Sequence, residues 1–281
     1  MDLAPGLVVV GHSTLDAYDG GYLIGGAAYA ALTGARLGYR VGLATSFGPD
    51  LVASSVLGGI AIANLASHQS TVFHNVYGGG QRVQTLVSFA LPLLPSQMPS
   101  CWPAAPLVLL APMAGEVGEE WLDAFPGAVM GACPQGWLRR SGPQGRVEAS
   151  PWAWAEAGLP KLEVLVVSLD DIAGDEKLAS SWSTRVRCLV LTLGARGAWV
   201  YFEGGRTHLP AVAVSRVVDP TGAGDAFATA FLVKWYEGHG PIKAGRFASR
   251  VAGAVVEGKG LDGVPSPERM EDAWRRVASE P

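Results

Sequence analysis

Short apolar runs bounded by Gly, Pro and Asp recur along this chain of 281 residues, with segments of helical pattern between them. Such runs are typical of strands that are buried on both faces of a parallel sheet. We therefore expect an α/β fold with a mainly parallel central sheet. Because such sheets bind ligands beyond the carboxyl ends of their strands, we expect Asp16, Asp171 and Gly194 just past three of these ends. The predicted strands are residues 7–10, 40–44, 107–111, 128–132, 164–168 and 188–193.

Composition and charge limit the class of protein. With 49% hydrophobic and 16% charged residues, the chain can bury a large core as one domain spanning residues 1–281. A net charge of −4 without a basic run argues against nucleic acid or an anionic membrane as the main partner. No apolar stretch approaches the roughly 18 residues of a membrane span, and no signal peptide is evident. We expect a cytoplasmic protein whose partners are small molecules.

The three cysteines are Cys101, Cys133 and Cys188. Their odd number and wide spacing indicate neither a disulfide framework nor a zinc site. We expect all three to be structural thiols.

A glycine-rich turn at residues 218–224 leads directly into an amphipathic helix that begins near Ala223 and stops at Gly238. Gly222 and Gly224 allow a tight turn in which consecutive backbone amides point at one anion. The positive end of the helix faces the same anion. We therefore expect the backbone of Gly222, Ala223 and Gly224 to hold a phosphoryl group during its transfer.

Asp225 lies in the first turn of this helix. A carboxylate beside an anion site is unfavourable for binding phosphate alone, but it is well placed to take a proton from an attacking hydroxyl. We interpret Asp225 as a catalytic base. The alternative is a structural role, since Asp is a common dipole partner in first helical turns.

The string D-P-T-G-A-G-D-A-F at residues 219–227 closely resembles the C-terminal signature of the ribokinase-like (PfkB) carbohydrate kinase family. Other segments match in order: Gly25-Gly26 with residues 35–38 and 48–50 resembles the N-terminal signature, and residues 191–197 resemble the segment that supports the nucleotide. The resemblance implies a ribokinase-like three-layer sandwich with a small β lid. It also implies a kinase that uses ATP with Mg²⁺ to phosphorylate a hydroxyl of a sugar, an inositol-like polyol or a nucleoside-like molecule.

The resemblance further implies roles for single residues. Asp16 would hold the substrate hydroxyls beside the Gly25-Gly26 hinge, Asp171 would organise hydrated Mg²⁺, and Asp219 would lie near a monovalent-cation site, which leaves activation by K⁺ open. The residues expected to border the nucleotide are Thr192, Gly194, Thr221 and Gly258.

Two departures from the family pattern bear on the substrate and the metal. The family often has Asn shortly after the Gly-Gly pair, whereas residues 27–31 contain none, which puts ribose recognition in doubt. The family Asn-x-x-Glu aligns with residues 168–171, where Asp171 keeps a carboxylate and Ser168 replaces the amide. Mg²⁺ is usually held through waters and few carboxylates, so Asp171 could still serve. The alternative for Asp170 and Asp171 is ion pairing or helix capping.

Residues 71–77 and 82–89 alternate in polarity and are joined by Gly78-Gly79-Gly80, which predicts a β-hairpin. We expect this hairpin, within residues 70–90, to form the lid together with residues 17–25. An ordinary edge hairpin is the alternative. The short N-terminal contribution puts a lid-mediated dimer in doubt, so monomer and homodimer both stay open.

Arg139 follows a predicted strand, in a string that is similar to strings of an inositol kinase-like branch of the family. A guanidinium there could hold a transferring phosphate or an acidic substrate. A solvated pair with Arg140 is the alternative. We also expect Tyr29, Trp137 and the polar residues of the hairpin to shape the acceptor pocket; the latter include His74, Asn75, Arg82 and Gln84.

Three other functions stay open. The altered sites favour a non-catalytic sugar- or nucleotide-binding protein, whereas the retained Asp225 argues against it. A vitamin or pyrimidine kinase on the same fold is the second. A Rossmann dehydrogenase is the third, and the absence of GxGxxG after the first predicted strand argues against it.

Overall fold

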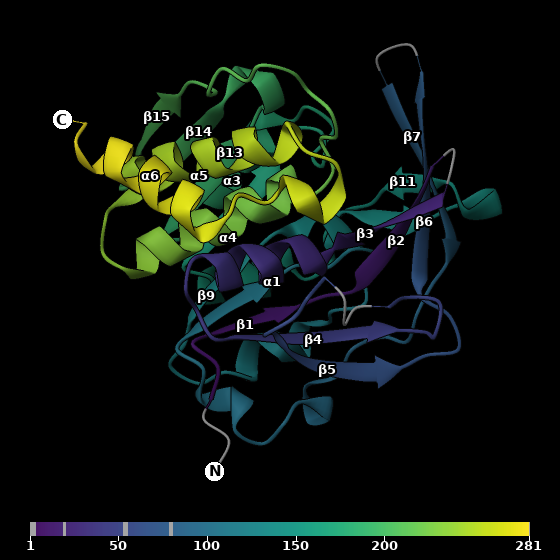
Figure 1. Cartoon of the computed structure of the whole chain (residues 1–281). Helices are drawn as coiled ribbons and strands as arrows, with labels where there is room; N and C mark the ends of the chain where they lie inside the picture. Colours follow the sequence, from purple (N-terminus) through teal and green to yellow (C-terminus); the bar gives the residue numbers. More distant parts are fainter. Residues whose placement is uncertain (1–3, 19–20, 53–55, 79–80, 281) are drawn as a thin grey trace.

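The computed structural model describes residues 4–18, 21–52, 56–78 and 81–280. These residues form a nine-stranded sheet in the order β15-β14-β13-β12-β9-β8-β1-β4-β5 (Figure 1). The strands pair in parallel from β13 to β5, and β14 and β15 are antiparallel. Their bounds are β1 Leu7–Val10, β4 Val41–Phe47, β5 Ala61–Ala66, β8 Leu107–Leu110, β9 Val129–Ala132, β12 Val164–Ser168, β13 Cys188–Thr192, β14 Ala198–Phe202 and β15 Gly205–Leu209.

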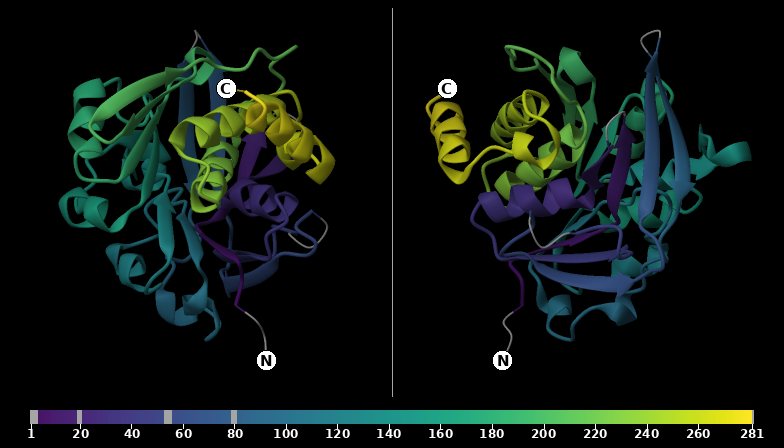
Figure 2. Two further views of the ribbon diagram at one scale, coloured as in Figure 1. Left: turned by 90° about the vertical axis from the view of Figure 1, so that its left-hand side faces the viewer. Right: turned by 45° about the vertical axis from the view of Figure 1, so that its right-hand side comes forward.

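Helices cover both faces of this sheet, which makes three layers (Figure 2). One face packs against α1 (Ala27–Arg36), α4 (Ala223–Tyr236), α5 (Pro241–Val256) and α6 (Pro267–Ala278). The other face packs against α2 (Ala155–Gly158), α3 (Glu176–Ser183) and short 3-10 helices. Alternate side chains of β1 point to opposite faces of the sheet, so Leu7 and Val9 pack in the core on the first face. Val8 and Val10 pack in the core on the other face. The predicted three-layer α/β fold is confirmed.

A second sheet, which we call the lid sheet, has the strand order β3-β2-β6-β7 among the described residues. It consists of β2 (Ser13–Tyr18), β3 (Gly21–Gly26), β6 (Thr71–Gly78) and β7 (Gln81–Ser88), and it stands away from the three layers in Figure 2. The short pair β10 (Arg139–Ser141) and β11 (Val147–Ala149) lies beside it, and Arg146 forms a bridge to Thr85 of β7.

The predicted strands of the central sheet coincide with observed ones to within a few residues, because each is a continuous buried run. The hairpin at residues 70–90 is also observed, although Gly79 and Gly80 of its predicted turn lie outside the described residues. The predicted contribution of residues 17–25 was too short: β2 and β3 cover Ser13–Tyr18 and Gly21–Gly26, and residues 19–20 lie outside the description.

Asp16 follows the end of β1, as expected, and it lies inside β2, where its Cα pairs with Leu23 on one side and Phe73 on the other. The chain leaves β1 through Gly11 and His12 and immediately starts the lid sheet. Asp16 is therefore held by the backbone ladder of the lid sheet.

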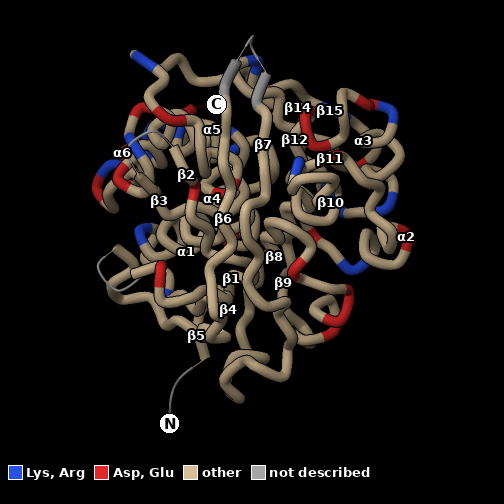
Figure 3. The backbone as a smooth tube through the Cα atoms, turned by 90° about the vertical axis from the view of Figure 1, so that its right-hand side faces the viewer, with Lys and Arg blue, Asp and Glu red and all other residues tan. Residues whose placement is uncertain are grey.

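Within the described ranges, the helices are all too short or too polar to cross a membrane. Acidic and basic residues are interspersed on the face that Figure 3 presents, as expected from the small net charge.

Candidate active site

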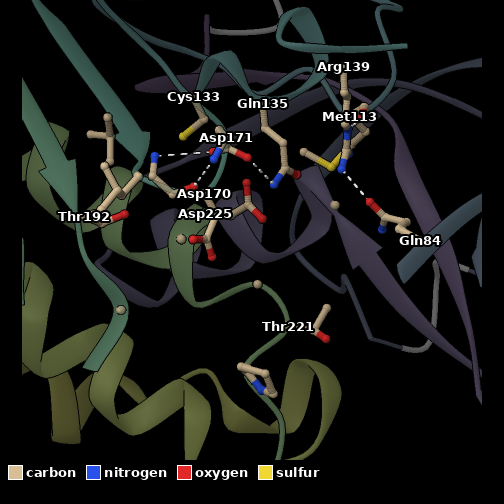
Figure 4. A pocket seen from close by; sticks show the side chains of 18 of the residues that line it. Gln84, Met113, Cys133, Gln135, Arg139, Asp170, Asp171, Thr192, Thr221 and Asp225 are labelled. Atoms are coloured by element: carbon tan, nitrogen blue, oxygen red, sulfur yellow. Dashed lines mark hydrogen bonds between the residues drawn. The ribbon is translucent and has the colours of Figure 1, made fainter. Parts of the chain in front are cut away.

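A cavity of about 760 Å³ lies between the carboxyl ends of the central strands and the lid sheet. Figure 4 shows Arg139, Met113 and Gln84 on one side of it, Thr192 on the other, and Asp225 between them. The cavity collects most of the predicted site residues: Asp16, Gly26, Arg139, Asp171, Thr192, Gly194, Thr221, Gly222, Gly224 and Asp225.

The predicted tight turn before α4 forms at Gly222, whereas Gly224 lies within the first turn of the helix. Gly222 has a φ of 75° and directly precedes the first residue of α4, Ala223, and a Cβ on Gly222 would lie 2.2 Å from the ring of Tyr29. That ring is fully buried beneath the turn, so Tyr29 supports the turn rather than lining the acceptor pocket. Burial, with the nearby carboxylates of Asp219, Asp16 and Asp225, raises the pKa of the Tyr29 hydroxyl, which keeps it neutral.

The environment of the cavity strongly perturbs the carboxyl group of Asp225. Its pKa is raised from 3.8 to about 7, chiefly because burial disfavours the charged form. Arg139 acts in the opposite direction, whereas Asp171 and Asp16 raise the pKa further. A carboxyl group that titrates near neutral pH can accept a proton and release it again.

At the lid end of the cavity, Asp16 lies against the glycine pair. A Cβ on Gly25 would lie 2.2 Å from Asp16 Oδ2 and 2.8 Å from Thr14 Oγ1. Only glycine therefore lets the end of β3 pass so close to this carboxylate. Gly25 itself does not line the cavity, whereas Gly26 does.

Arg139 and Arg140 have different environments. Arg139 Nε donates to the Met113 carbonyl (2.5 Å), Nη1 donates to Gln84 Oε1 (2.7 Å), and the guanidinium lies 4.8 Å from the ring centre of Phe73. Arg140 is exposed and pairs with Glu148 on the surface. The alternative of a solvated pair thus holds for Arg140 but not for Arg139.

The rest of the cavity wall includes Thr192, Gly194, Arg196 and Thr221 together with two adjacent carboxylates. Asp171 accepts hydrogen bonds from Gln135 Nε2 (3.2 Å) and from the Ser168 amide (3.3 Å), and its own amide donates to Ser168 Oγ (3.0 Å). Asp171 therefore stabilises the turn after β12 and also lines the cavity, and its hydrogen bonds are neither the ion pair nor the helix cap that we gave as the alternative. Asp170 is exposed to the same space.

The predicted site residues that lie outside this cavity include Gly25, Ala223, Asp219 and Gly258. Asp219 borders a second cavity of about 460 Å³, where it accepts from the amides of Thr221 (2.9 Å) and Gly260 (3.1 Å). Gly258, at the end of α5, packs against Gly263 and lines neither cavity. The two cavities share Asp16 and Thr221.

Several residues of the cavity were not predicted. Gln135, Met113 and Phe73 line it without having been predicted to do so, whereas Gln84 lines it as expected of the polar residues of the hairpin. Cys133 also lines it, and burial raises the pKa of its thiol well above the usual range, so it stays protonated.

Trp137 does not line the cavity. Its ring stacks on Trp152 in the core, with 4.7 Å between ring centres.

Comparison with known proteins matches parts of the chain by sequence and nearly all of it by fold. A family profile described as pfkB family carbohydrate kinase matches residues 154–269. A nucleoside kinase of Methanocaldococcus jannaschii is 36% identical over 76 residues, which is 27% of this chain and 25% of that protein. A solved structure described as a pyrophosphate-dependent kinase of the ribokinase family, complexed with a pyrophosphate analog and myo-inositol, gives a TM-score of 0.78 at 22% identity, covering 94% of this chain and 99% of that one. The ribokinase of Arabidopsis thaliana, complexed with ribose and ATP, gives 0.75 at 20% identity, covering 97% and 99%.

The shared architecture makes this chain an α/β protein of the ribokinase fold, with a ligand cavity between its central sheet and a β-sheet lid. As the sequence resemblance predicted, residues 154–269, which include the string at 219–227, match the profile of the pfkB family carbohydrate kinases. The matched segments span about a quarter of the length of the first curated relatives, at 25%, 28% and 22%.

Proposed function

We propose that this protein is a small-molecule kinase that transfers a phosphoryl group to a hydroxyl of a sugar, a polyol or a nucleoside-like acceptor. The observation that carries the proposal is the position of Asp225. Its carboxyl group has a pKa of about 7 and lies beside a glycine-bounded helix N-terminus, in one cavity with Asp16 and Arg139. A purely binding protein has no need of a proton acceptor at its anion site.

In the proposed reaction, Asp16 accepts hydrogen bonds from acceptor hydroxyls and orients one of them towards Asp225. Asp225 takes the proton of that hydroxyl as its oxygen attacks the terminal phosphorus of the donor. The new O–P bond forms while the bond to the leaving phosphate breaks. The backbone amides at Gly222, Ala223 and Gly224, with the positive end of α4, stabilise charge on the phosphoryl oxygens. Asp225 afterwards releases its proton to solvent.

The donor end suits a hydrated magnesium ion. The described residues contain no group of three or more His, Cys, Asp or Glu side chains arranged to bind a metal. Mg²⁺ usually needs only one or two carboxylates, because waters and phosphates complete its shell. We propose that Asp171, with the exposed Asp170, holds the hydrated ion, which would neutralise charge on the donor phosphates. Asp219, in the other cavity, remains the candidate for K⁺.

We propose ATP as the donor, in line with the bound ATP of the similar Arabidopsis ribokinase. Pyrophosphate is the second candidate, because it is the donor named for the similar inositol-bound kinase. Thr192, Gly194, Arg196 and Thr221 could contact the phosphates of either donor. A cytoplasmic location and the choice between monomer and homodimer stay predictions.

The test is a matrix of two donors, ATP and pyrophosphate, against pentoses, hexoses, inositols and nucleosides, with Mg²⁺ and with or without K⁺. We expect turnover with one donor and a narrow group of acceptors. Asp225→Asn should lower kcat by a factor of about 10² to 10⁴, because it removes the base and keeps the size of the side chain. Asp272→Asn, an exposed carboxylate on α6, is the matched control and should retain the wild-type rate.

The outcomes separate the remaining alternatives. Saturable donor binding without turnover of any acceptor would favour the non-catalytic binding protein. Turnover that persists in Asp225→Asn would show that Asp225 is not the base, although the protein would still be a kinase. Failure to bind either donor would contradict the whole proposal.

A further inference from the structure

A buried carboxylate that the proposed reaction does not use lies behind the lid end of the cavity. Glu116, in the loop after β8, is 1% exposed. Its Oε1 accepts hydrogen bonds from the amides of His12 (2.9 Å) and Met113 (2.7 Å), and its Oε2 accepts from the amide of Ala114 (2.7 Å). Burial opposes its charge, but His12 and the amides together hold the pKa of Glu116 below its usual range. The carboxylate therefore fixes three backbone amides from two segments.

The first of these segments joins Glu116 to the base of the lid hairpin. The ring of His12 is fully buried, and its Nε2 donates to the Leu91 carbonyl (2.9 Å). Its Nδ1 lies 2.8 Å from Thr71 Oγ1, which also accepts from the Ala90 amide (2.9 Å). Thr71 starts β6, and Ala90 follows the end of β7. The start and the end of the hairpin therefore both connect through Thr71 to His12, and the amide of His12 donates to Glu116.

The second segment joins Glu116 to the cavity wall. Met113, whose amide Glu116 holds, accepts the hydrogen bond from Arg139 Nε through its carbonyl, and Arg139 Nη1 reaches Gln84 in the middle of β7. All three of Met113, Arg139 and Gln84 line the cavity. The loop that carries Glu116 therefore contacts the hairpin at its base through His12 and at its middle through Arg139.

We propose that Glu116 is a positioning residue for the acceptor: its three hydrogen bonds set the Met113 loop, and through it the guanidinium of Arg139 and the place of the lid hairpin. The effect on the acceptor rests on the proposed kinase function. The mechanical link from Glu116 to the hairpin does not, because it follows from the contacts of the protein alone.

Amide hydrogen exchange of the ligand-free protein tests the link. Glu116→Gln keeps the size of the side chain but turns an NH₂ group towards one of the three amides, which leaves that amide without an acceptor. We expect about tenfold faster exchange in residues 112–118 and also in residues 84–91, with residues 164–168 and 188–192 unchanged. Glu119→Gln, an exposed glutamate three residues along the chain, is the control and should match the wild type.

The same experiment can overturn the proposal. Faster exchange confined to residues 112–118 would make Glu116 a local loop residue, and faster exchange in β12 and β13 as well would make it a general stability residue. If Glu116→Gln does not fold, Arg139→Lys tests the second half of the link, because it leaves the hydrogen bonds of Glu116 in place. It should speed exchange in residues 84–91 only, and an unchanged hairpin would refute the link.

Steady-state kinetics test the consequence for the acceptor. With an acceptor identified in the donor and acceptor assay of the proposed function, Glu116→Gln should raise the acceptor KM about tenfold and leave the donor KM unchanged. In an Arg139→Lys background the same substitution should add less than it does alone, because part of its effect acts through the same guanidinium. Additive effects, or equal rises in both KM values, would contradict positioning. If the wild type phosphorylates no acceptor, the kinase proposal fails while the exchange data still decide the mechanical link.

Discussion

The charge at Asp225 should leave a pH-dependent mark on the stability of the ligand-free protein. The pKa of Asp225 is about 7 in the folded state, against a usual 3.8, chiefly because of burial. Between these values the folded protein keeps a proton that the unfolded chain has lost. Wild-type stability therefore falls as the pH rises from about 4 to about 7 and levels off above that. Asparagine cannot ionise, so Asp225→Asn should not show this loss.

The size of the effect follows from the two pKa values. Each pH unit between them corresponds to about 1.4 kcal/mol, which gives a ceiling of about 4 kcal/mol above pH 7. The residue faces an open cavity, where water screens part of the charge, and we reduce the expected gain to about 2 kcal/mol. For a chain of this length, that corresponds to a melting temperature about 3 °C higher.

Thermal melts of wild type and Asp225→Asn at pH 5, 6, 7 and 8 would measure the difference directly. We expect the variant to gain little at pH 5 and to reach its full advantage by pH 8. Asp170→Asn, an exposed carboxylate of the same cavity, is the control and should change the melting temperature little at any pH. A difference that does not vary with pH, or a variant less stable than wild type at pH 8, would refute the reasoning.

Four further predictions concern residues of the cavity. Because the base must be unprotonated to act, kcat/KM for the acceptor should fall about tenfold per pH unit below about pH 7, and a flat profile would exclude Asp225 as the base. Gly222→Ala should destabilise the protein by about 3 kcal/mol or more in denaturant titrations, because its Cβ would overlap a buried tyrosine ring at positive φ. Gly224→Ala, whose Cβ would meet nothing within 4 Å, should fold normally and weaken donor binding only. Arg139→Lys should raise the acceptor KM because lysine cannot keep both hydrogen bonds, whereas Arg140→Lys on the surface should not.

The parts of the site that the sequence predicted are those that local chemistry determines. The turn at Gly222 and the helix after it depend on neighbouring residues alone, and the start of α4 at Ala223 is where we expected it. Asp171 was also found, since it follows a strand that is recognisable as one apolar run. Local sequence patterns are sufficient where the functional residues and the residues that position them are adjacent in the chain.

Other parts depend on contacts between distant segments, which no local pattern reveals. Gln84 reaches Arg139 across 55 residues of sequence, and Met113 joins them through a backbone carbonyl that any residue could supply. The strand that carries Asp16 was not among the predicted strands, because Ser13 and Thr14 at its start are polar. Both are buried in β2, where the Ser13 amide donates to Thr45 Oγ1. Burial of polar residues at strand starts obscures the pattern from which strands are predicted.

The second cavity has a practical consequence for the search for an acceptor. It adjoins the first at Asp16 and Thr221, and its walls include the partly exposed Tyr18 and Val218 together with Lys259, whose ammonium lies 4.5 Å from the ring centre of Tyr18. A molecule whose hydroxyl reaches Asp225 therefore has lined space for a second ring or a substituent. Libraries restricted to single sugars would test only ligands that fill the first cavity. Disaccharides, nucleosides and substituted inositols should therefore be included from the start.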